Sequence, residues 1–325
     1  MQRQLPEAED AFVDVDGMRT HYLRAGSGRP LLMIHGLVGS AANWGKNIGV
    51  LARQASVYAI DLVNMGRSAR VAGLDAGLEA TADRVAATME ALGLEQADVA
   101  AHSHGGAVAL MLAARHPARV RSLVLFAPAN PYCSRPGMLN FFSSLAGRVL
   151  ARSSPYLPRP FHLKALARMY GEPERIDPGS IAGYVVPLRV PGTVDHILSV
   201  VRGWVSNMRR LKAVLPRLAQ VPTLLLWGDR DRAVTLRSGL QLHRALAASR
   251  LVVLQSGGHI LFQEMPEESN RRMVQWLRKT FKEEALPAWK HGEAALLPRS
   301  AARFPALSVR PQPGAGAMRH LSPGA

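Results

Sequence analysis

Residues 101–106 read Ala-His-Ser-His-Gly-Gly and lie between an expected strand over residues 98–101 and an expected helix over residues 105–115. A tight turn from strand into helix needs small residues on both sides of its apex, because the backbone there is strained. Alanine and glycine stand at these two places, so the turn would lift the Ser103 hydroxyl clear of the sheet. A helix start capped by serine is also a common structural feature, and this segment alone leaves both interpretations open.

Buried apolar runs and amphipathic segments alternate on both sides of this turn. The expected strands are Phe12–Val15, Arg19–Leu23, Leu31–Ile34, Val57–Leu62, Asp98–Ala101, Val120–Phe126, Thr223–Trp227 and Leu251–Leu254. The expected helices are Ala42–Gln54, Glu79–Leu92, Gly105–Arg115, Leu236–Ala247 and Glu267–Phe281. Alternation of this kind predicts an α/β fold with a mostly parallel β-sheet and helices on both of its faces.

The alternation stops between residues 130 and 218, where prolines separate short helical segments. Two groups of apolar residues in this block repeat at helical spacing. They are Met138, Phe141, Phe142, Leu145 and Val149, and Ile197, Val201, Trp204, Met208 and Leu211. We therefore expect an all-helical cap at residues 130–218, inserted between two parts of the α/β core at residues 1–129 and 219–282. Residues 283–325 are rich in Ala, Pro, Gly and Arg, which predicts a disordered tail.

Two further polar residues follow later strands. Asp231 ends the segment Gly-Asp-Arg-Asp just past one expected strand, and His259 ends Gly-Gly-His past the next. Sites in open parallel sheets form at the carboxyl ends of the strands, so Ser103, Asp231 and His259 are candidates for one site. A serine nucleophile needs a base, which imidazole supplies near pH 7, and a carboxylate fixes the tautomer of that imidazole. Asp229 is the competing acid, two residues earlier.

A glycine-containing loop follows the strand over residues 31–34. Residues 35–40 read His-Gly-Leu-Val-Gly-Ser, and the glycines suggest that backbone amides approach a ligand. Together with the N–H of His104, the N–H of Leu37 could complete an oxyanion hole. A plain turn is the competing interpretation of this loop.

These segments occur in the order in which the α/β-hydrolase family carries them, and the chain resembles the form of that family with a helical cap. The resemblance covers roughly residues 11–281 and includes Asp61 with the Gly-Arg-Ser of residues 66–68. Ala101 replaces the usual first glycine of the turn, and residues 61–66 replace a commoner Pro-Gly-His variant. Family members that open epoxides or remove halide place Asp where this chain has serine, which argues against both reactions.

The resemblance implies a role for each candidate residue. Ser103 would be the nucleophile, Asp231 the acid and His259 the base. The backbone N–H groups of Leu37 and His104 would bind the oxyanion, and the block at residues 130–218 would cover the site. Substrate contacts are expected from His35, Gly36, Phe141, Phe142 and Trp204. For the cap residues among them, packing of the cap onto the core is the alternative.

The implied activity is hydrolysis of a carboxylic ester that carries an apolar group, through an acyl-enzyme. Carbon–carbon bond hydrolysis, amide cleavage and cofactor-free perhydrolysis are alternatives on the same triad, and the fold does not choose among them. Members that cleave carbon–carbon bonds tend to carry Asn before the nucleophile, where this chain has His102. A non-catalytic binding protein on this scaffold would usually have lost a triad residue, and all three are present.

The chain is strongly basic, with 40 Lys and Arg against 24 Asp and Glu in 325 residues, a net charge of +16. Residues 131–220 hold 13 basic and 4 acidic side chains, net +9. No nucleic-acid-binding module is recognisable and aromatic residues make up only 6%, so a nucleic-acid partner is not expected. A basic cap would attract anionic substrates or an acidic membrane surface; solvated arginines are the alternative. The cap residues of interest are Arg148, Arg152, Arg202, Arg209, Arg210 and Lys212.

Several classes of protein are excluded by composition. The single Cys133 rules out an internal disulfide and a Cys-rich metal site, and no other cluster has metal-ligand spacing. No phosphate-binding or dinucleotide fingerprint is present, so neither a metal nor a cofactor is expected. No apolar run approaches the roughly 18 residues that cross a bilayer, and residues 1–7 lack a secretory pattern. We therefore expect a cytoplasmic protein, with its oligomeric state left open.

Overall fold

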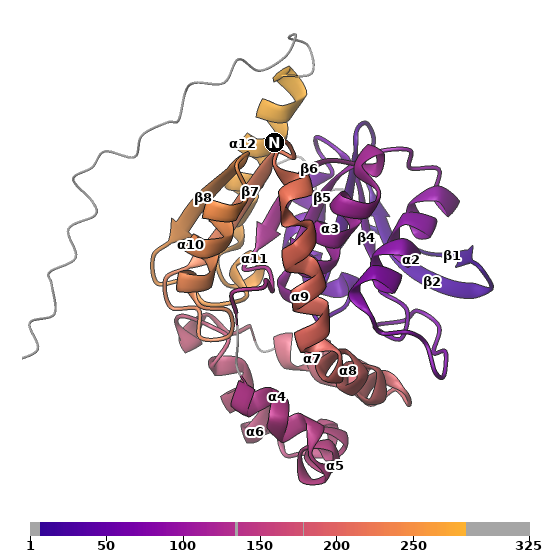
Figure 1. The fold of residues 1–325 in the computed structure, drawn as a ribbon, viewed down its shortest axis with the longest axis vertical. Coiled ribbons are helices and arrows are strands. Elements are labelled where there is room, and N and C mark those ends of the chain that lie inside the picture. Colours follow the sequence, from indigo (N-terminus) through magenta and orange to yellow (C-terminus); the bar gives the residue numbers. More distant parts are fainter. Residues whose placement is uncertain (1–6, 134–135, 178, 284–325) are drawn as a thin grey trace, which may run out of the picture. The chain divides into compact units, whose positions relative to one another are not determined.

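The computed structural model describes residues 7–133, 136–177 and 179–283. Eight strands form one sheet in the order β1-β2-β4-β3-β5-β6-β7-β8 (Figure 1). They are β1 Glu9–Val15, β2 Met18–Ala25, β3 Pro30–Ile34, β4 Ser56–Ile60, β5 Ala97–His102, β6 Val120–Phe126, β7 Thr223–Gly228 and β8 Ser249–Leu254. Strand β2 runs antiparallel to β1 and β4, and all other neighbours are parallel. The expected mostly parallel α/β sheet is confirmed.

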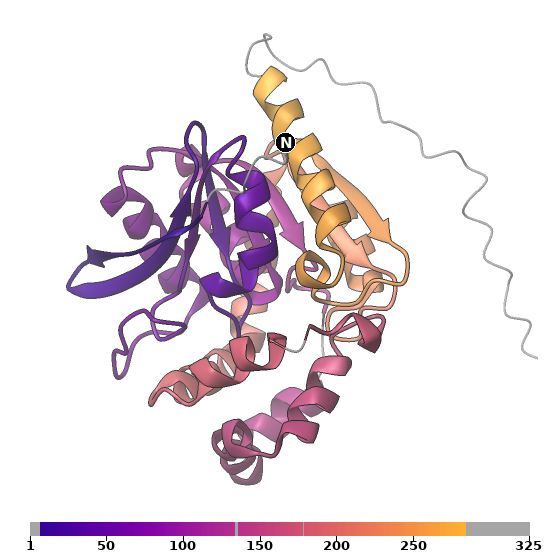
Figure 2. The same cartoon turned by 180° about the vertical axis from the view of Figure 1, so that it is seen from behind.

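Helices cover both faces of the sheet, as Figures 1 and 2 show from opposite sides. The core helices are α1 Gly45–Leu51, α2 Leu78–Ala91, α3 Ser103–Arg115, α10 Leu236–Ala245, α11 Leu261–Glu264 and α12 Pro266–Glu283. Apolar side chains of α2, α3 and α10 pack into one cluster, and those of α1, α11 and α12 pack into another. The central strand β5 is buried along its whole length, because both of its faces are covered.

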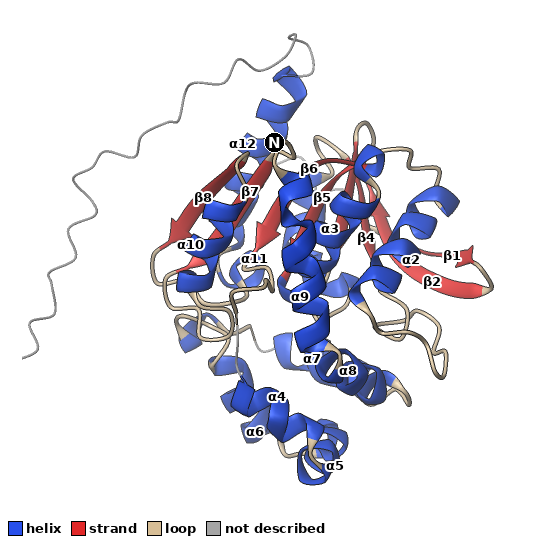
Figure 3. Ribbon diagram, in the orientation of Figure 1, coloured by secondary structure: helices blue, strands red, loops and turns tan. Residues whose placement is uncertain are grey.

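The inserted block is all-helical in the described part of the chain, and Figure 3 shows helices and loops there but no strand. Its helices are α4 Pro136–Ser143, α5 Leu145–Ser153, α6 Arg159–Ala167, α7 Ser180–Leu188, α8 Thr193–Arg202 and α9 Trp204–Val214. Short 3₁₀ turns lie at Ala41–Trp44, Pro117–Arg119, Ser154–Tyr156, Pro173–Arg175 and Leu215–Leu218. The helical cap is thus present, whereas the predicted tail at residues 283–325 falls almost wholly outside the described residues.

The two apolar repeats of the cap do not form two continuous helices. The first is interrupted at Ser144, whose hydroxyl accepts a hydrogen bond from the N–H of Gly147 and so begins α5. The second is interrupted at Gly203, which separates α8 from α9. Within the described residues, no helix is long and apolar enough to span a membrane.

Candidate active site

The turn at residues 101–106 has the strained form that its sequence predicts. Strand β5 ends at His102, and Ser103 begins α3 with a φ of 51°, in the left-handed region that residues other than glycine rarely adopt. A side chain at Gly105 would place its Cβ 2.2 Å from the carbonyl oxygen of His35, so only glycine fits there. The turn therefore holds Ser103 at the carboxyl edge of the sheet, directly before the unpaired amides of a helix N-terminus.

Asp231 and His259 meet at the same edge. His259 Nδ1 lies 2.8 Å from Asp231 Oδ2, and both side chains are buried. The second oxygen of Asp231 accepts the N–H groups of Ala233 and Val234 at 2.8 and 2.9 Å, so the carboxylate is fixed from both sides. Asp229 is exposed and does not contact His259. With Nδ1 donating to the carboxylate, Nε2 of His259 remains as the proton acceptor.

His102 connects the turn that carries Ser103 to the loop that carries His259. Its Nε2 donates to the carbonyl oxygen of His259 at 3.1 Å, and the two rings lie 4.6 Å apart. Burial, and then the neighbouring His259, lower the pKa of His102 well below its usual value. The Ser103 hydroxyl makes no hydrogen bond to His259 in the structure; in enzymes without substrate such bonds are often longer than in the working complex.

The loop after β3 packs directly against the turn that carries Ser103. A Cβ added to Gly36 would lie 2.8 Å from His102 Nδ1 and 3.3 Å from Ser103 Cβ, so the loop backbone can come this close only with glycine. The N–H of Leu37, the next residue, belongs to this approaching segment. The structure thus brings together the loop and the helix start from which the two oxyanion donors are expected.

The ring of His35 is held by backbone groups at both of its nitrogens. It is fully buried, its Nδ1 donates to the carbonyl oxygen of Gly36 at 2.7 Å, and its Nε2 accepts the N–H of Leu62 at 3.1 Å. Both ring nitrogens are therefore occupied by backbone, and burial lowers the pKa of this imidazole, which keeps it neutral. The expected contact of His35 with substrate stays a prediction.

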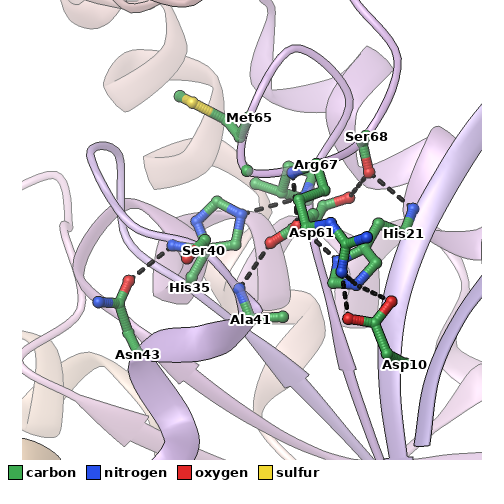
Figure 4. Close-up of polar contacts among 12 residues, drawn as sticks. Asp10, His21, His35, Ser40, Ala41, Asn43, Asp61, Met65, Arg67 and Ser68 are labelled. Carbon is green, nitrogen blue, oxygen red and sulfur yellow. Dashed lines mark hydrogen bonds and ion pairs between the residues drawn. The ribbon is translucent and has the colours of Figure 1, made fainter. Parts of the chain in front are cut away.

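Asp61 stabilises the end of the same loop through hydrogen bonds, a role that the sequence did not predict. Its Oδ1 accepts the N–H of Ala41 at 2.6 Å, and its Oδ2 accepts the N–H of Arg67 and Nδ1 of His21, each at 2.7 Å (Figure 4). Burial alone would raise the pKa of this carboxyl, but these hydrogen bonds and nearby His35 bring it below its usual value. The sequence marked Asp61 only as part of the family resemblance, together with the Gly-Arg-Ser of residues 66–68, and assigned it no role.

Glu264 is a second buried carboxylate that sequence reasoning missed. Its Oε2 accepts the N–H of Gly258 at 2.7 Å, and its Oε1 accepts the N–H groups of Gly171 and Glu172 at 2.9 and 3.0 Å. The N–H of His259 also donates to the carbonyl oxygen of Met169 at 2.6 Å. The cap segment between α6 and α7 is therefore hydrogen-bonded to the loop that carries the base.

The three cap residues from which substrate contacts are expected do not lie in one place. Trp204 lies beside His104, whereas Phe141 and Phe142 lie in α4. The Trp204 ring lies 6.4 Å from the ring of His104, which places this residue beside the nucleophile turn. Phe141 is 44% exposed and packs against Phe142 with ring centroids 5.2 Å apart. No hydrogen bond or ring contact joins either phenylalanine to Ser103, so their part in substrate binding stays a prediction.

The side chain of His104 faces a small closed space. A cavity of about 20 Å³ is lined by His104, His196 and residues from β4 and α2, which is room for about one water molecule. His104 Nδ1 is buried without a hydrogen-bond partner. Burial, and then His196, lower the pKa of His104 to about 3, and burial with nearby arginines lowers the pKa of His196 to about 4. Both imidazoles are neutral at pH 7.

The buried imidazoles predict that the folded state loses stability in mild acid. Between about pH 6.5 and the folded pKa of His104, about 3, the unfolded chain binds a proton that the folded chain does not. The free energy of unfolding should therefore be largest above about pH 6.5 and fall by about 1 kcal/mol per pH unit for this residue below it. Urea unfolding across this range measures the slope.

The variant His104→Met serves as the control for that measurement. Methionine fills a similar volume and cannot bind a proton, so the slope of stability against pH should become shallower by one proton. An unchanged slope in this variant would contradict the assignment to His104.

Among the described residues, no group of three His, Cys, Asp or Glu side chains is arranged to hold a metal ion.

Comparisons with known proteins bear on the family and the fold of the chain. Residues 29–266 match a family model described as alpha/beta hydrolase fold. The chain is 30% identical to 2-hydroxymuconate semialdehyde hydrolase of Pseudomonas sp. (strain CF600), over 75% of this chain and 84% of that protein. It is 28% identical to the dihydrolipoyllysine-residue acetyltransferase component of the acetoin cleaving system of Pseudomonas putida, over 86% of this chain and 71% of that protein.

Among solved structures, the chain is similar to a membrane phospholipase A that is described as a novel bacterial virulence factor. The two share 27% sequence identity and a TM-score of 0.68, over 84% of this chain and 87% of that one. The names of these three proteins describe different activities.

Proposed function

Because the chain belongs to the α/β-hydrolase family, we propose that it is a serine hydrolase that cleaves a carboxylic ester through an acyl-enzyme intermediate. The observation that carries the proposal is the buried pair of His259 and Asp231, 2.8 Å apart, at the same sheet edge as Ser103 on its strained turn. A buried base that is oriented by a carboxylate, at the same sheet edge as a half-buried serine on a strained turn, fits the arrangement that nucleophilic acyl transfer requires.

In the proposed reaction, Ser103 Oγ attacks the acyl carbon and its proton passes to His259 Nε2. Asp231 stabilises the imidazolium that results, and the N–H groups of Leu37 and His104 bind the oxyanion of the tetrahedral intermediate. The intermediate collapses, and the leaving alkoxide takes the proton from His259. Water then attacks the acyl-enzyme with His259 again as base, which releases the carboxylic acid and restores Ser103.

Carbon–carbon bond hydrolysis is a second candidate, favoured by the 30% identity to 2-hydroxymuconate semialdehyde hydrolase over most of that protein. Both reactions would use the same nucleophile and oxyanion donors, so the geometry of the triad does not separate them. The residue before the nucleophile is His102, and its ring is engaged with the backbone of His259.

A panel of p-nitrophenyl esters with graded acyl length tests the ester proposal. We expect turnover of at least one ester, with a preference for apolar acyl groups, because the apolar ring of Trp204 in the cap lies 6.4 Å from the ring of His104, the residue after Ser103. The measurement is kcat/KM for each ester, beside cleavage of a diketone-like substrate by the same preparation. Cleavage of the diketone with no activity on any ester would replace the proposal with the second candidate.

A further inference from the structure

The outer helices of the cap expose an unusual amount of apolar surface. Among the described residues, twelve large apolar side chains are exposed, and seven of them lie between residues 141 and 163. They are Phe141, Leu145, Val149, Leu150, Tyr156, Phe161 and Leu163. Leu145 is 69% exposed and Phe161 is 59% exposed, values at which most of each side chain meets solvent. Apolar side chains gathered in this way mark an interaction surface rather than ordinary surface variation.

The same helices carry basic side chains and no acidic side chain of their own. No Asp or Glu occurs from Val99 to Gly171 in the sequence. Arg152 pairs with Asp195 of α8, but no ion pair of the described residues neutralises Arg159, Lys164 or Arg168. We define the outer cap surface as the exposed large apolar and basic side chains of α5 and α6, with Arg168, the residue that follows α6. Its members are Leu145, Val149, Leu150, Arg152, Arg159, Phe161, Leu163, Lys164 and Arg168.

The position of this surface leaves it open to a partner. Figures 1 and 2 both show α4, α5 and α6 on the side of the cap away from the sheet. Helix α5 turns its small residue inward, since a Cβ at Gly147 would lie 2.0 Å from the carbonyl oxygen of Phe141 in α4. Leu145 and Val149, four residues apart, therefore share a face of α5 that points away from this contact.

We propose that the outer cap surface binds the surface of an anionic phospholipid bilayer. Aliphatic and aromatic side chains can enter the boundary between headgroups and acyl chains, while Arg159, Lys164 and Arg168 meet the negative phosphates. A second copy of the chain fits less well, because two outer cap surfaces would bring together like charges. The proposal goes beyond ester hydrolysis and does not depend on the triad.

The test uses the full-length chain and vesicles of phosphatidylcholine with or without phosphatidylglycerol. We expect sedimentation with the anionic vesicles, much weaker binding to phosphatidylcholine alone, and loss of binding as salt is added. Arg159→Gln with Lys164→Gln should weaken binding roughly 25-fold, about fivefold for each charge. Leu145→Ser with Val149→Ser should weaken it at least about tenfold, because the inserted apolar area is lost.

Matched controls come from α10 of the core, which is also exposed and basic. Leu240, 43% exposed, is replaced by serine, and Arg237 and Arg244 are replaced by glutamine, with no expected change in binding. The variant Ser103→Ala should bind vesicles as the wild type does, so a failure of the proposed hydrolase function would not affect this result. All surface variants should keep their turnover of a soluble ester.

Three outcomes would overturn the proposal. The first is no binding of the wild-type chain to anionic vesicles. The second is equal weakening by the α10 controls, which would show that net charge rather than the outer cap surface drives binding. The third is a concentration-dependent dimer, seen by light scattering, that Leu145→Ser with Val149→Ser abolishes while vesicle binding is unchanged.

Discussion

Replacing Ser103 by alanine is expected to lower kcat by roughly 10⁴- to 10⁶-fold on any ester that the protein hydrolyses. The substitution removes the only atom that would form the acyl bond, and binding with oxyanion stabilisation alone would remain. KM should change little, because the hydroxyl adds little to ground-state binding. Steady-state kinetics on the best p-nitrophenyl ester measures the effect.

The control for this prediction is Ser206→Ala, an exposed serine of α9 that should leave kcat unchanged. A fluorophosphonate probe gives a second measurement, since it forms a covalent bond with an activated serine. The wild-type chain should be labelled at Ser103, whereas the alanine variant should not react. Labelling of Ser103→Ala at the wild-type rate would contradict the assignment of the nucleophile.

Replacing Asp231 by asparagine is expected to lower kcat on the order of 10⁴-fold. The amide can still accept the N–H groups of Ala233 and Val234 through its oxygen, so the fold should persist. It can also present an N–H₂ group to His259, which favours the tautomer whose Nε2 carries the proton and cannot act as a base. A thermal unfolding curve beside the kinetics separates loss of activity from loss of structure.

Asp229→Asn is the matched control, because it makes the same chemical change two residues away. Asp229 is exposed and contributes only its backbone N–H to the carbonyl oxygen of Leu254, so its variant should retain nearly full activity. Equal losses in the two variants would mean that local charge, rather than the contact with His259, supports the reaction.

The core could be predicted from the sequence because its signals are local. Buried strands such as β5 and β7 are short apolar runs that end at glycine or at a polar turn, and both boundaries agree with the expected ones to within two residues. The strained turn at Ser103 could likewise be predicted from the small residues beside it. One of them, Gly105, has to be small because it lies close to the carbonyl oxygen of His35.

For the cap, the sequence could predict that the block is helical but not where each helix begins and ends. The interval of four residues from Phe141 to Leu145 continues across Ser144, so periodicity alone gives no sign that one helix ends and another begins. The break depends on the Ser144 hydroxyl, which accepts the N–H of Gly147 and stabilises a new helix start.

The sequence could not show which basic residues of the cap form ion pairs, because their acidic partners come from distant elements. Arg152 pairs with Asp195 and Arg210 pairs with Glu79, so two of the residues singled out by sequence are neutralised. The roles of Asp61 and Glu264 could not be predicted for the same reason. Each carboxylate accepts hydrogen bonds from backbone N–H groups of segments that are distant in the sequence or carry no recognisable motif.

The hydrogen bonds of Glu264 define which part of the cap can be exchanged in a chimaeric enzyme. These contacts use the backbone of residues 169–172, so a graft from another hydrolase that gave this segment a different backbone path would leave Oε1 of the buried carboxylate without two donors and remove the acceptor for the His259 N–H. We expect chimaeras that exchange this short segment to disturb the loop of His259, and those that leave it in place to preserve that loop. The natural module for transplantation is then residues 136–167, with residues 168–172 kept from this chain.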